Sequence, residues 1–184
     1  MIGGWGLPIN AEIGGKVYPI NSDFRDVLEV VEWLNKPDDD EMTRLYVALS
    51  LFYEQFESMP QSCYDEAVKW MMDFIALGEE DDVKRRPKLF DWEQDRNVIV
   101  SEINKVAGQE VRSLDFLHWW TFVGYFNCIG EGQFSMIVSV RDKIQRGKTL
   151  ERYEREFYNR NRIRVDFKRK YTQEEDELLD KWMK

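Results

Sequence analysis

The chain of 184 residues carries its clearest fold signal at residues 22–34, which read SDFRDVLEVVEWL. From Phe24 onward, apolar side chains recur there at the three- and four-residue spacing of one helix face. Ser22 is a residue type that caps helix N-termini, and Asp23 and Asp26 suit the positive end of the helix dipole. The stretch predicts an amphipathic helix that buries its apolar face, and therefore a fold built from packed helices.

On the N-terminal side of this helix, residues 13–20 read IGGKVYPI, which is two short extended runs around a Gly-Gly turn. This pattern is typical of a β-hairpin. Pro19 restricts the second run to an edge position, because proline cannot donate to a sheet ladder. We expect the hairpin within residues 10–21.

On the C-terminal side, helical spacing recurs in five further segments, which are residues 41–56, 62–78, 90–108, 113–127 and 133–146. Ser113 is the predicted N-cap of the fourth segment, and Gly108 ends the third. Met72 and Ile144 fall on predicted core faces. The charged residues 149–170 are also expected to be helical.

Residues 79–88 are charged and almost free of apolar side chains, as linkers and mobile loops are. They separate the helices up to residue 78 from a second helical set in residues 90–147. We predict a body of residues 1–147 and an arm of residues 148–184. The fold class is mainly α, a helical bundle with a short N-terminal β-hairpin and a charged C-terminal helical arm.

The net charge of −9 averages over two opposed regions. Residues 1–140 hold 12 basic and 25 acidic residues (net −13), whereas residues 141–170 hold 12 basic and 5 acidic residues (net +7). An acidic body argues against a general nucleic-acid coat, because phosphate binding needs a cationic surface.

The arm interleaves basic and aromatic residues, which leaves a nucleic-acid strip open as an alternative. Acidic residues are mixed into the arm, so the favoured interpretation is a charged helical face that meets an acidic protein surface. That surface belongs to this chain's own body, a second copy or another protein. The candidate contact residues are Arg160, Arg162 and Arg164.

Catalytic residue types are scarce, with one histidine, His118, and two cysteines, Cys63 and Cys128. Neither cysteine belongs to a metal or redox motif, and we expect both to be buried free thiols in a reducing compartment. The sequence has no signal-peptide pattern and no apolar run of the roughly 20 residues that span a bilayer. We expect a cytosolic protein without membrane contact, cofactor, metal site or catalytic residues.

The sequence contains one cluster of acidic residues and one cluster of aromatic residues beside His118. The acidic residues between Asp91 and Asp95 suit the first turn of a helix better than a metal site, which needs more ligands. His118 is expected to be a hydrogen-bonded structural residue. The neighbouring aromatic residues are core residues or, since exposed tryptophan is enriched at interfaces, candidate protein contacts. These candidates are Trp119, Trp120, Phe122 and Tyr125.

Four segments together carry a resemblance to a known family. They are INSDFR at residues 20–25, FDWEQD at 90–95, LHWWTF at 117–122 and IVSVR at 137–141. In this order they resemble the bacteriophage "Gp fifteen" family of siphophages of Gram-positive hosts.

The resemblance implies a non-catalytic tail assembly chaperone, which binds the tape-measure protein and helps recruit tail tube subunits. It implies a place in the host cytoplasm and absence from the mature virion, and self-association is a plausible extension. The alternatives are a structural tail connector or completion protein and, through the basic arm, a nucleic-acid-binding regulator.

Overall fold

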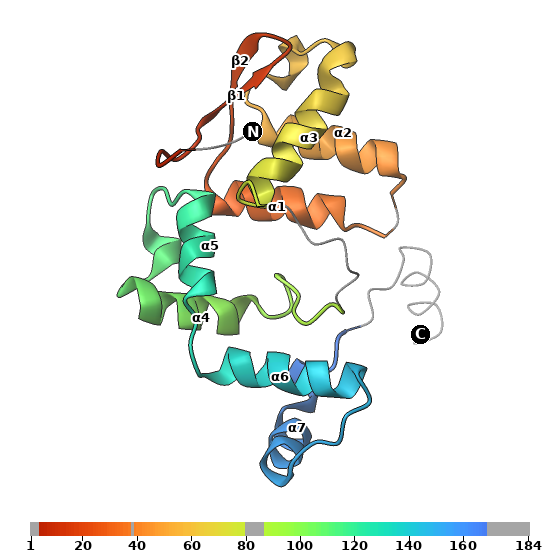
Figure 1. The fold of residues 1–184 in the computed structure, drawn as a ribbon, viewed down its shortest axis with the longest axis vertical. Coiled ribbons are helices and arrows are strands. Elements are labelled where there is room, and N and C mark those ends of the chain that lie inside the picture. The colour runs from red at the N-terminus through yellow and green to blue at the C-terminus, as the bar shows by residue number, and fades with distance from the viewer. Residues whose placement is uncertain (1–3, 38, 80–86, 169–184) are drawn as a thin grey trace, which may run out of the picture. The chain divides into compact units, whose positions relative to one another are not determined.

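The computed structural model describes residues 4–37, 39–79 and 87–168 of the chain (Figure 1). These residues contain seven α-helices and one two-stranded antiparallel sheet near the N-terminus. The predicted mainly α fold with an N-terminal hairpin is therefore confirmed. No helix in the described ranges combines the length and the apolar character that crossing a bilayer requires.

The described residues divide into two compact units. Unit 1 holds the residues up to 79 together with residues 116–122, and unit 2 holds residues 87–115 and 123–168. Most of the predicted linker, residues 80–86, lies outside the described residues. The helix predicted for the arm belongs to unit 2, and the division at residue 147 stays a prediction.

The hairpin opens unit 1. β1 (Asn10–Ile13) pairs antiparallel with β2 (Lys16–Pro19), so that Asn10 lies opposite Pro19 and Ile13 opposite Lys16. Gly14 and Gly15 form the turn with φ values of 57° and 73°, which is the left-handed geometry of a type I′ hairpin turn.

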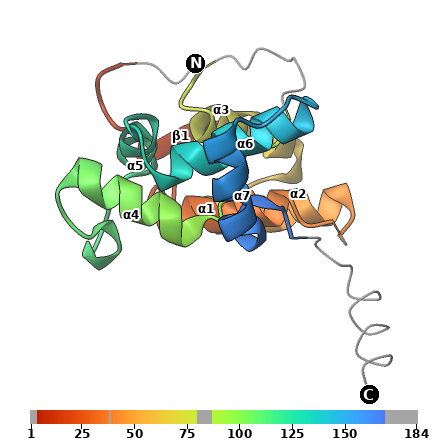
Figure 2. The same cartoon turned by 90° about the horizontal axis from the view of Figure 1, so that it is seen from below.

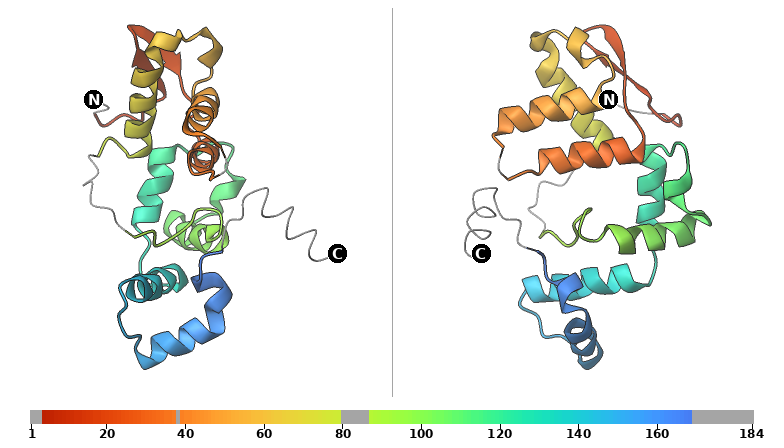
Figure 3. Two further views of the ribbon diagram at one scale, coloured as in Figure 1. Left: turned by 90° about the vertical axis from the view of Figure 1, so that its right-hand side faces the viewer. Right: turned by 180° about the vertical axis from the view of Figure 1, so that it is seen from behind.

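Three helices follow the hairpin in unit 1: α1 (Phe24–Leu34), α2 (Glu41–Phe52) and α3 (Tyr64–Ile75), with 3-10 turns at Phe56–Ser58 and Gln61–Cys63. α1 and α2 lie side by side (Figure 3). The unit also holds the first turn of α5 (Trp119–Asn127). Its core is rich in aromatic residues, and the Phe52 and Phe74 rings lie 5.3 Å apart.

The structure corrects three details predicted for unit 1. Asp23, not Ser22, caps α1, because the Asp23 carboxylate accepts from the backbone N–H of Arg25 at 3.0 Å. α2 ends at Phe52 rather than near residue 56, because the next residue, Tyr53, turns extended and forms a β-bridge with Ile20. Met72 is 47% exposed and does not join the core.

Unit 2 contains α4 (Arg96–Ala107), a 3-10 turn at Val111–Ser113, the later residues of α5, α6 (Gln133–Gln145) and α7 (Arg152–Val165). α7 lies across α6 (Figure 2). Between them Ile137, Val140 and Val165 form a buried cluster. Lys143 of α6 also pairs with the buried Glu154 of α7 at 2.6 Å.

Several boundaries of unit 2 also differ from prediction. Gly108 ends α4 in the left-handed region, as predicted. Ser113 closes a 3-10 turn instead of capping a helix, and α5 begins only at Trp119. Ile144 is 43% exposed rather than buried. Cys128 is exposed, so the prediction that both free thiols are buried is wrong.

Candidate functional site

Residues 20–25 and residues 117–122 meet in unit 1. The Asp23 carboxylate accepts from the Leu117 N–H at 2.8 Å, and the Phe24 N–H donates to the Leu117 carbonyl at 2.9 Å. The Trp119 N–H donates to the Ser22 carbonyl at 2.8 Å. Segments that are far apart in the sequence are thus held together by short hydrogen bonds at the start of α1.

Asp23 is ionised at this junction, because its hydrogen-bond partners lower the pKa of the carboxyl by more than burial raises it. Burial alone raises the pKa of the carboxyl, but hydrogen bonds from the Arg25 side chain and from the N–H groups of Leu117 and Arg25 hold the pKa below its usual range. The Arg25 guanidinium donates twice, at 2.7 and 2.9 Å.

Asp23→Asn should destabilise unit 1 at neutral pH by about 1–2 kcal/mol, because hydrogen bonds to a carboxylate are stronger than those to an amide. A lowered pKa in the folded state gives stability above the range in which aspartate ordinarily titrates, and that stability is lost as the pH falls through the folded pKa. Thermal unfolding of both proteins at several pH values should therefore show their difference shrinking in acid.

Asp26→Asn is the matched control. The pKa of Asp26 is raised by burial and by the charge of Asp23, so its ionised form is disfavoured in the fold. Neutralising it should leave neutral-pH stability unchanged or improve it. Equal destabilisation by both substitutions would contradict the role assigned to Asp23.

The His-Trp-Trp triplet holds the start of α5 in unit 1. His118 is buried, its Nδ1 accepts from the Trp120 N–H at 3.1 Å, and its Nε2 lies 2.9 Å from the Pro8 carbonyl. The indole N–H of Trp119 donates to the Ile75 carbonyl, and that of Trp120 to the Phe74 carbonyl, both at the end of α3. His118 is the hydrogen-bonded structural residue that we expected.

The aromatic candidates for partner binding lie mostly inside the fold. Trp119 and Phe122 are 3% and 1% exposed. Trp120 and Tyr125 are half-buried, and only Trp120 belongs to unit 1. A binding role for these four residues stays a prediction. The low exposure of Trp119 and Phe122 shows that both side chains pack inside the fold.

Residues 90–95 and residues 137–141 meet in unit 2 through a buried ion pair. Both side chains are 2% exposed, and the Arg141 guanidinium binds the Asp95 carboxylate at 2.5 and 3.0 Å. Asp95 precedes α4 and does not sit in its first turn, so the prediction of a merely acidic helix start is wrong. Asp91 shapes the same turn by accepting from the N–H groups of Glu93 and Gln94.

Arg141 also fixes the C-terminal end of α7. Its guanidinium donates to the carbonyls of Val165 and Arg164, each at 2.7 Å, and to the Leu89 carbonyl at 3.0 Å. The Phe167 ring covers the guanidinium at 4.1 Å. Arg141, neutralised by Asp95, therefore anchors the end of α7, the helix that carries the basic candidate residues.

The basic candidates lie on this anchored helix end. Arg160, Arg162 and Arg164 are all exposed, and Arg162 pairs with Asp166 at 3.1 Å. Between them Ile163 is 83% exposed. The three arginines and Ile163 thus all lie in the last turns of α7, where the backbone departs from helical geometry at Asn161.

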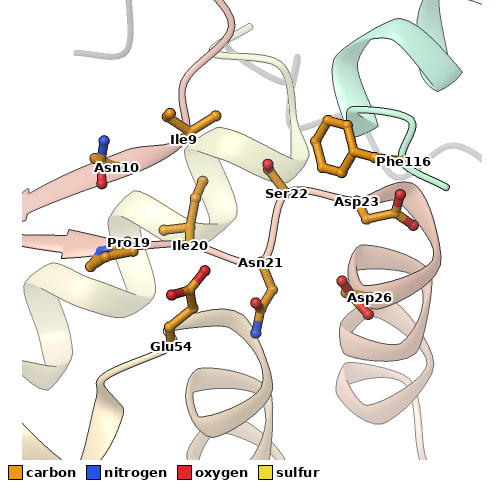
Figure 4. A pocket seen from close by; sticks show the side chains of 10 residues that line it. All are labelled: Ile9, Asn10, Pro19, Ile20, Asn21, Ser22, Asp23, Asp26, Glu54 and Phe116. Atoms are coloured by element: carbon orange, nitrogen blue, oxygen red, sulfur yellow. The ribbon is translucent and has the colours of Figure 1, made fainter.

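A pocket of about 400 Å³ opens beside the Asp23 junction in unit 1 (Figure 4). It is lined by Ile9, Asn10, Pro19, Ile20, Asn21, Ser22, Asp23, Asp26, Glu54 and Phe116. Ile9 and Phe116 are 57% and 56% exposed. Figure 4 shows the Asp26 and Glu54 side chains on either side of Asn21, with Ile9 and Phe116 at the other end.

The pocket is acidic as well as apolar. In the described part of the chain, neither the Asp26 nor the Glu54 carboxylate takes part in a hydrogen bond or an ion pair. Within the same part, no three histidine, cysteine, aspartate or glutamate side chains are grouped as a metal site requires. The arrangement suits a segment that presents an apolar side chain next to a cation.

The four quoted segments belong to a match that spans most of the chain. The family model described as "Bacteriophage Gp15 protein" matches residues 6–167. The chain belongs to the bacteriophage Gp15 family. No curated protein and no solved structure gives a significant match. Membership indicates a phage protein of the structural or assembly-related kind.

In this Gp15 protein, sequence reasoning missed the pocket and the exposure of Ile163 in α7. Phe116 directly precedes the quoted LHWWTF segment, but its sequence position carries no sign of exposure. Ile163 lies between Arg162 and Arg164 in the sequence, and these charged neighbours are the one sequence signal of its exposure. Asp26 was interpreted only as a helix-dipole residue.

Proposed function

We propose that this Gp15 protein is a tail assembly chaperone in phages of Gram-positive hosts. It holds the tape-measure protein in the host cytoplasm, helps recruit tail tube subunits, carries out no catalysis and is left out of the mature virion. The observation that supports this proposal is the unit 1 pocket, which combines exposed apolar side chains with carboxylates that are unpaired within the described ranges.

The pocket matches the chemistry expected of the client. A tape-measure protein is long, largely helical and rich in apolar heptads, so unassembled copies expose apolar stripes that invite aggregation. Ile9 and Phe116 offer apolar contact, and Asp26 and Glu54 offer charge to a neighbouring lysine or arginine. A helix recognised in this way lays one apolar side chain and one cation into the pocket.

Phe116→Ala combined with charge reversal at Asp26 and Glu54 tests the pocket. Truncating an interface anchor costs about 2 kcal/mol or more, so the affinity for the client should fall at least about tenfold. The measurement is co-expression with the tape-measure protein of the same phage, followed by co-purification and titration at low salt.

Glu57→Lys with Asp73→Lys provides a control of matched charge reversal at exposed positions outside the pocket. This control should bind the client like the wild-type protein. Failure of the wild-type protein to co-purify with the client, with tube protein also present, would refute the chaperone. Detection of the chain in purified virions would favour a structural tail component instead.

A further inference from the structure

We propose that the end of α7 from a second copy of this chain covers the unit 1 pocket while no client is bound. The inference rests on the proposed function, because it names what regulates the pocket that the client uses. Two observations carry it, and in both the lack of partners refers to the described residues. In unit 2, an exposed isoleucine is flanked by Arg160 and Arg164, whose guanidinium groups are unpaired. In unit 1, an apolar pocket holds two unpaired carboxylates.

The end of α7 carries an exposed apolar side chain and exposed cations, which are the groups that the pocket would bind. Ile163 is 83% exposed although Val165, two residues later, is buried. Arg162 is engaged with Asp166, but the guanidinium groups of Arg160 and Arg164 form no hydrogen bond or ion pair within the described ranges. One exposed aliphatic side chain and two cations that are unpaired within the described residues therefore lie within residues 160–164, on the two sides of the non-helical Asn161.

This helix end is held in place by contacts within its own unit. Arg141, itself neutralised by Asp95, donates to the carbonyls of Arg164 and Val165. Gln94 donates to the Asp166 carbonyl at 2.9 Å. A segment that is fixed before it binds loses less conformational entropy on docking, which favours an interface over a freely mobile arm.

The pocket complements that chemistry group by group. Asp26 and Glu54 supply two carboxylates that have no partner among the residues the structure describes, and Ile9 and Phe116 supply exposed apolar surface. The pairing predicted is Ile163 on the apolar end of the pocket and the two arginines on the carboxylates. The pKa of Asp26 is raised by burial and by neighbouring carboxylates, so an incoming cation relieves a repulsion already present.

The charge distribution of the whole chain favours a second copy as the occupant. Residues 1–140 carry a net charge of −13 and residues 141–170 a net charge of +7. Opposite charges on two copies attract each other during encounter and speed association at low ionic strength. Because the two surfaces differ, the contact closes either as a reciprocal exchange between two chains or as a head-to-tail assembly. A client that enters the pocket must displace α7, so client binding disassembles the resting oligomer.

The test uses light scattering of the full-length protein with charge-swapped variants. The wild-type protein should self-associate at low salt and dissociate as salt is raised. Arg160→Glu with Arg164→Glu should weaken self-association about tenfold or more, and so should Asp26→Arg with Glu54→Arg. An equimolar mixture of the two double variants should form a complex, because each retains the charge that the other now needs.

Arg152→Glu with Arg155→Glu is the matched control, since it makes the same change in net charge at the other end of α7. It should self-associate like the wild-type protein. A wild-type protein that stays monomeric at low salt, or a mixture that forms no complex, would overturn the inference. A dimer and a larger assembly both support it, provided that the two double variants disrupt it.

Client titration separates this inference from the proposed function. The Arg160→Glu, Arg164→Glu variant keeps its pocket, so it should bind the tape-measure protein at least as tightly as the wild-type protein does. Self-association without any client binding would refute the proposed chaperone function but not the self-association. Client binding without self-association would defeat the regulation alone, and loss of client binding in the arginine variant would show that α7 contacts the client instead.

Discussion

Arg141→Met is expected to lower the free energy of unfolding of unit 2 by about 3–5 kcal/mol, because removing one partner of a buried ion pair leaves the other charge uncompensated. Asp95 would remain buried, the carbonyls of Leu89 and Val165 would lose their donor, and the Arg164 carbonyl would keep only the Gln94 side chain at 3.3 Å. Urea unfolding followed by tryptophan fluorescence and circular dichroism measures this loss. The unfolding of the two units is analysed separately, because two compact units need not unfold in one transition.

Arg152→Met is the control for this prediction. Its ion pair with Glu156 also joins an arginine to a carboxylate, but the arginine side chain is 94% exposed, and such pairs contribute about 0–1 kcal/mol. The double change Asp95→Leu with Arg141→Met should recover only part of the loss, because the carbonyls of Leu89 and Val165 remain without the donor that Arg141 supplied. Equal effects of Arg141→Met and Arg152→Met would disprove the anchoring role of Arg141.

Phe122→Ala should destabilise unit 1 by about 3–5 kcal/mol, the usual cost of emptying an aromatic core position. The Phe122 ring stacks on the Phe24 ring with centroids 4.4 Å apart and is 1% exposed. Its loss leaves a cavity between the start of α1 and the start of α5, where the two segments of unit 1 are joined. Thermal unfolding and near-ultraviolet circular dichroism report the change.

Phe116→Ala is the matched comparison, because this phenylalanine is 56% exposed. It should change stability by no more than about 0.5 kcal/mol while weakening client binding. A Phe122→Ala protein that unfolds like the wild type but no longer binds the client would instead support the contact role that the sequence allowed for Phe122.

Local pattern was sufficient for the elements whose residues interact with near neighbours. The Gly14-Gly15 turn, the apolar face of α1 and the end of α4 at Gly108 follow from spacing and backbone preference. The cap of α1 was predicted one residue too early, at Ser22 instead of Asp23. The Asp23 carboxylate also accepts a hydrogen bond from Leu117, which is distant in the sequence. Local rules do not include such a partner.

The functional geometry depends on distant partners and was therefore beyond the sequence. Asp95 was assigned to a helix start because nothing near it shows that Arg141 neutralises it inside unit 2. Trp119 was left open between core and interface, and no local pattern showed that it is buried with its indole N–H donating to the Ile75 carbonyl. The pocket draws its lining from separate stretches of unit 1, so no single motif marks it.

The junction of residues 20–25 with residues 117–122 also sets an order of events during protein synthesis. A nascent chain that has emerged only to residue 79 contains α1, α2 and α3 but lacks Leu117 and Phe122, so Asp23 has not gained its hydrogen bond from Leu117 and Phe24 has not gained its ring stack with Phe122. At about 5–20 residues per second, the missing segment follows roughly 2–9 s later. Unit 1 is then completed by a contact of high sequence separation, which forms late. Unit 1 and its pocket are therefore completed only after residues 87–115 of unit 2 have emerged, so under the proposed function the finished pocket is not offered to a client before that point.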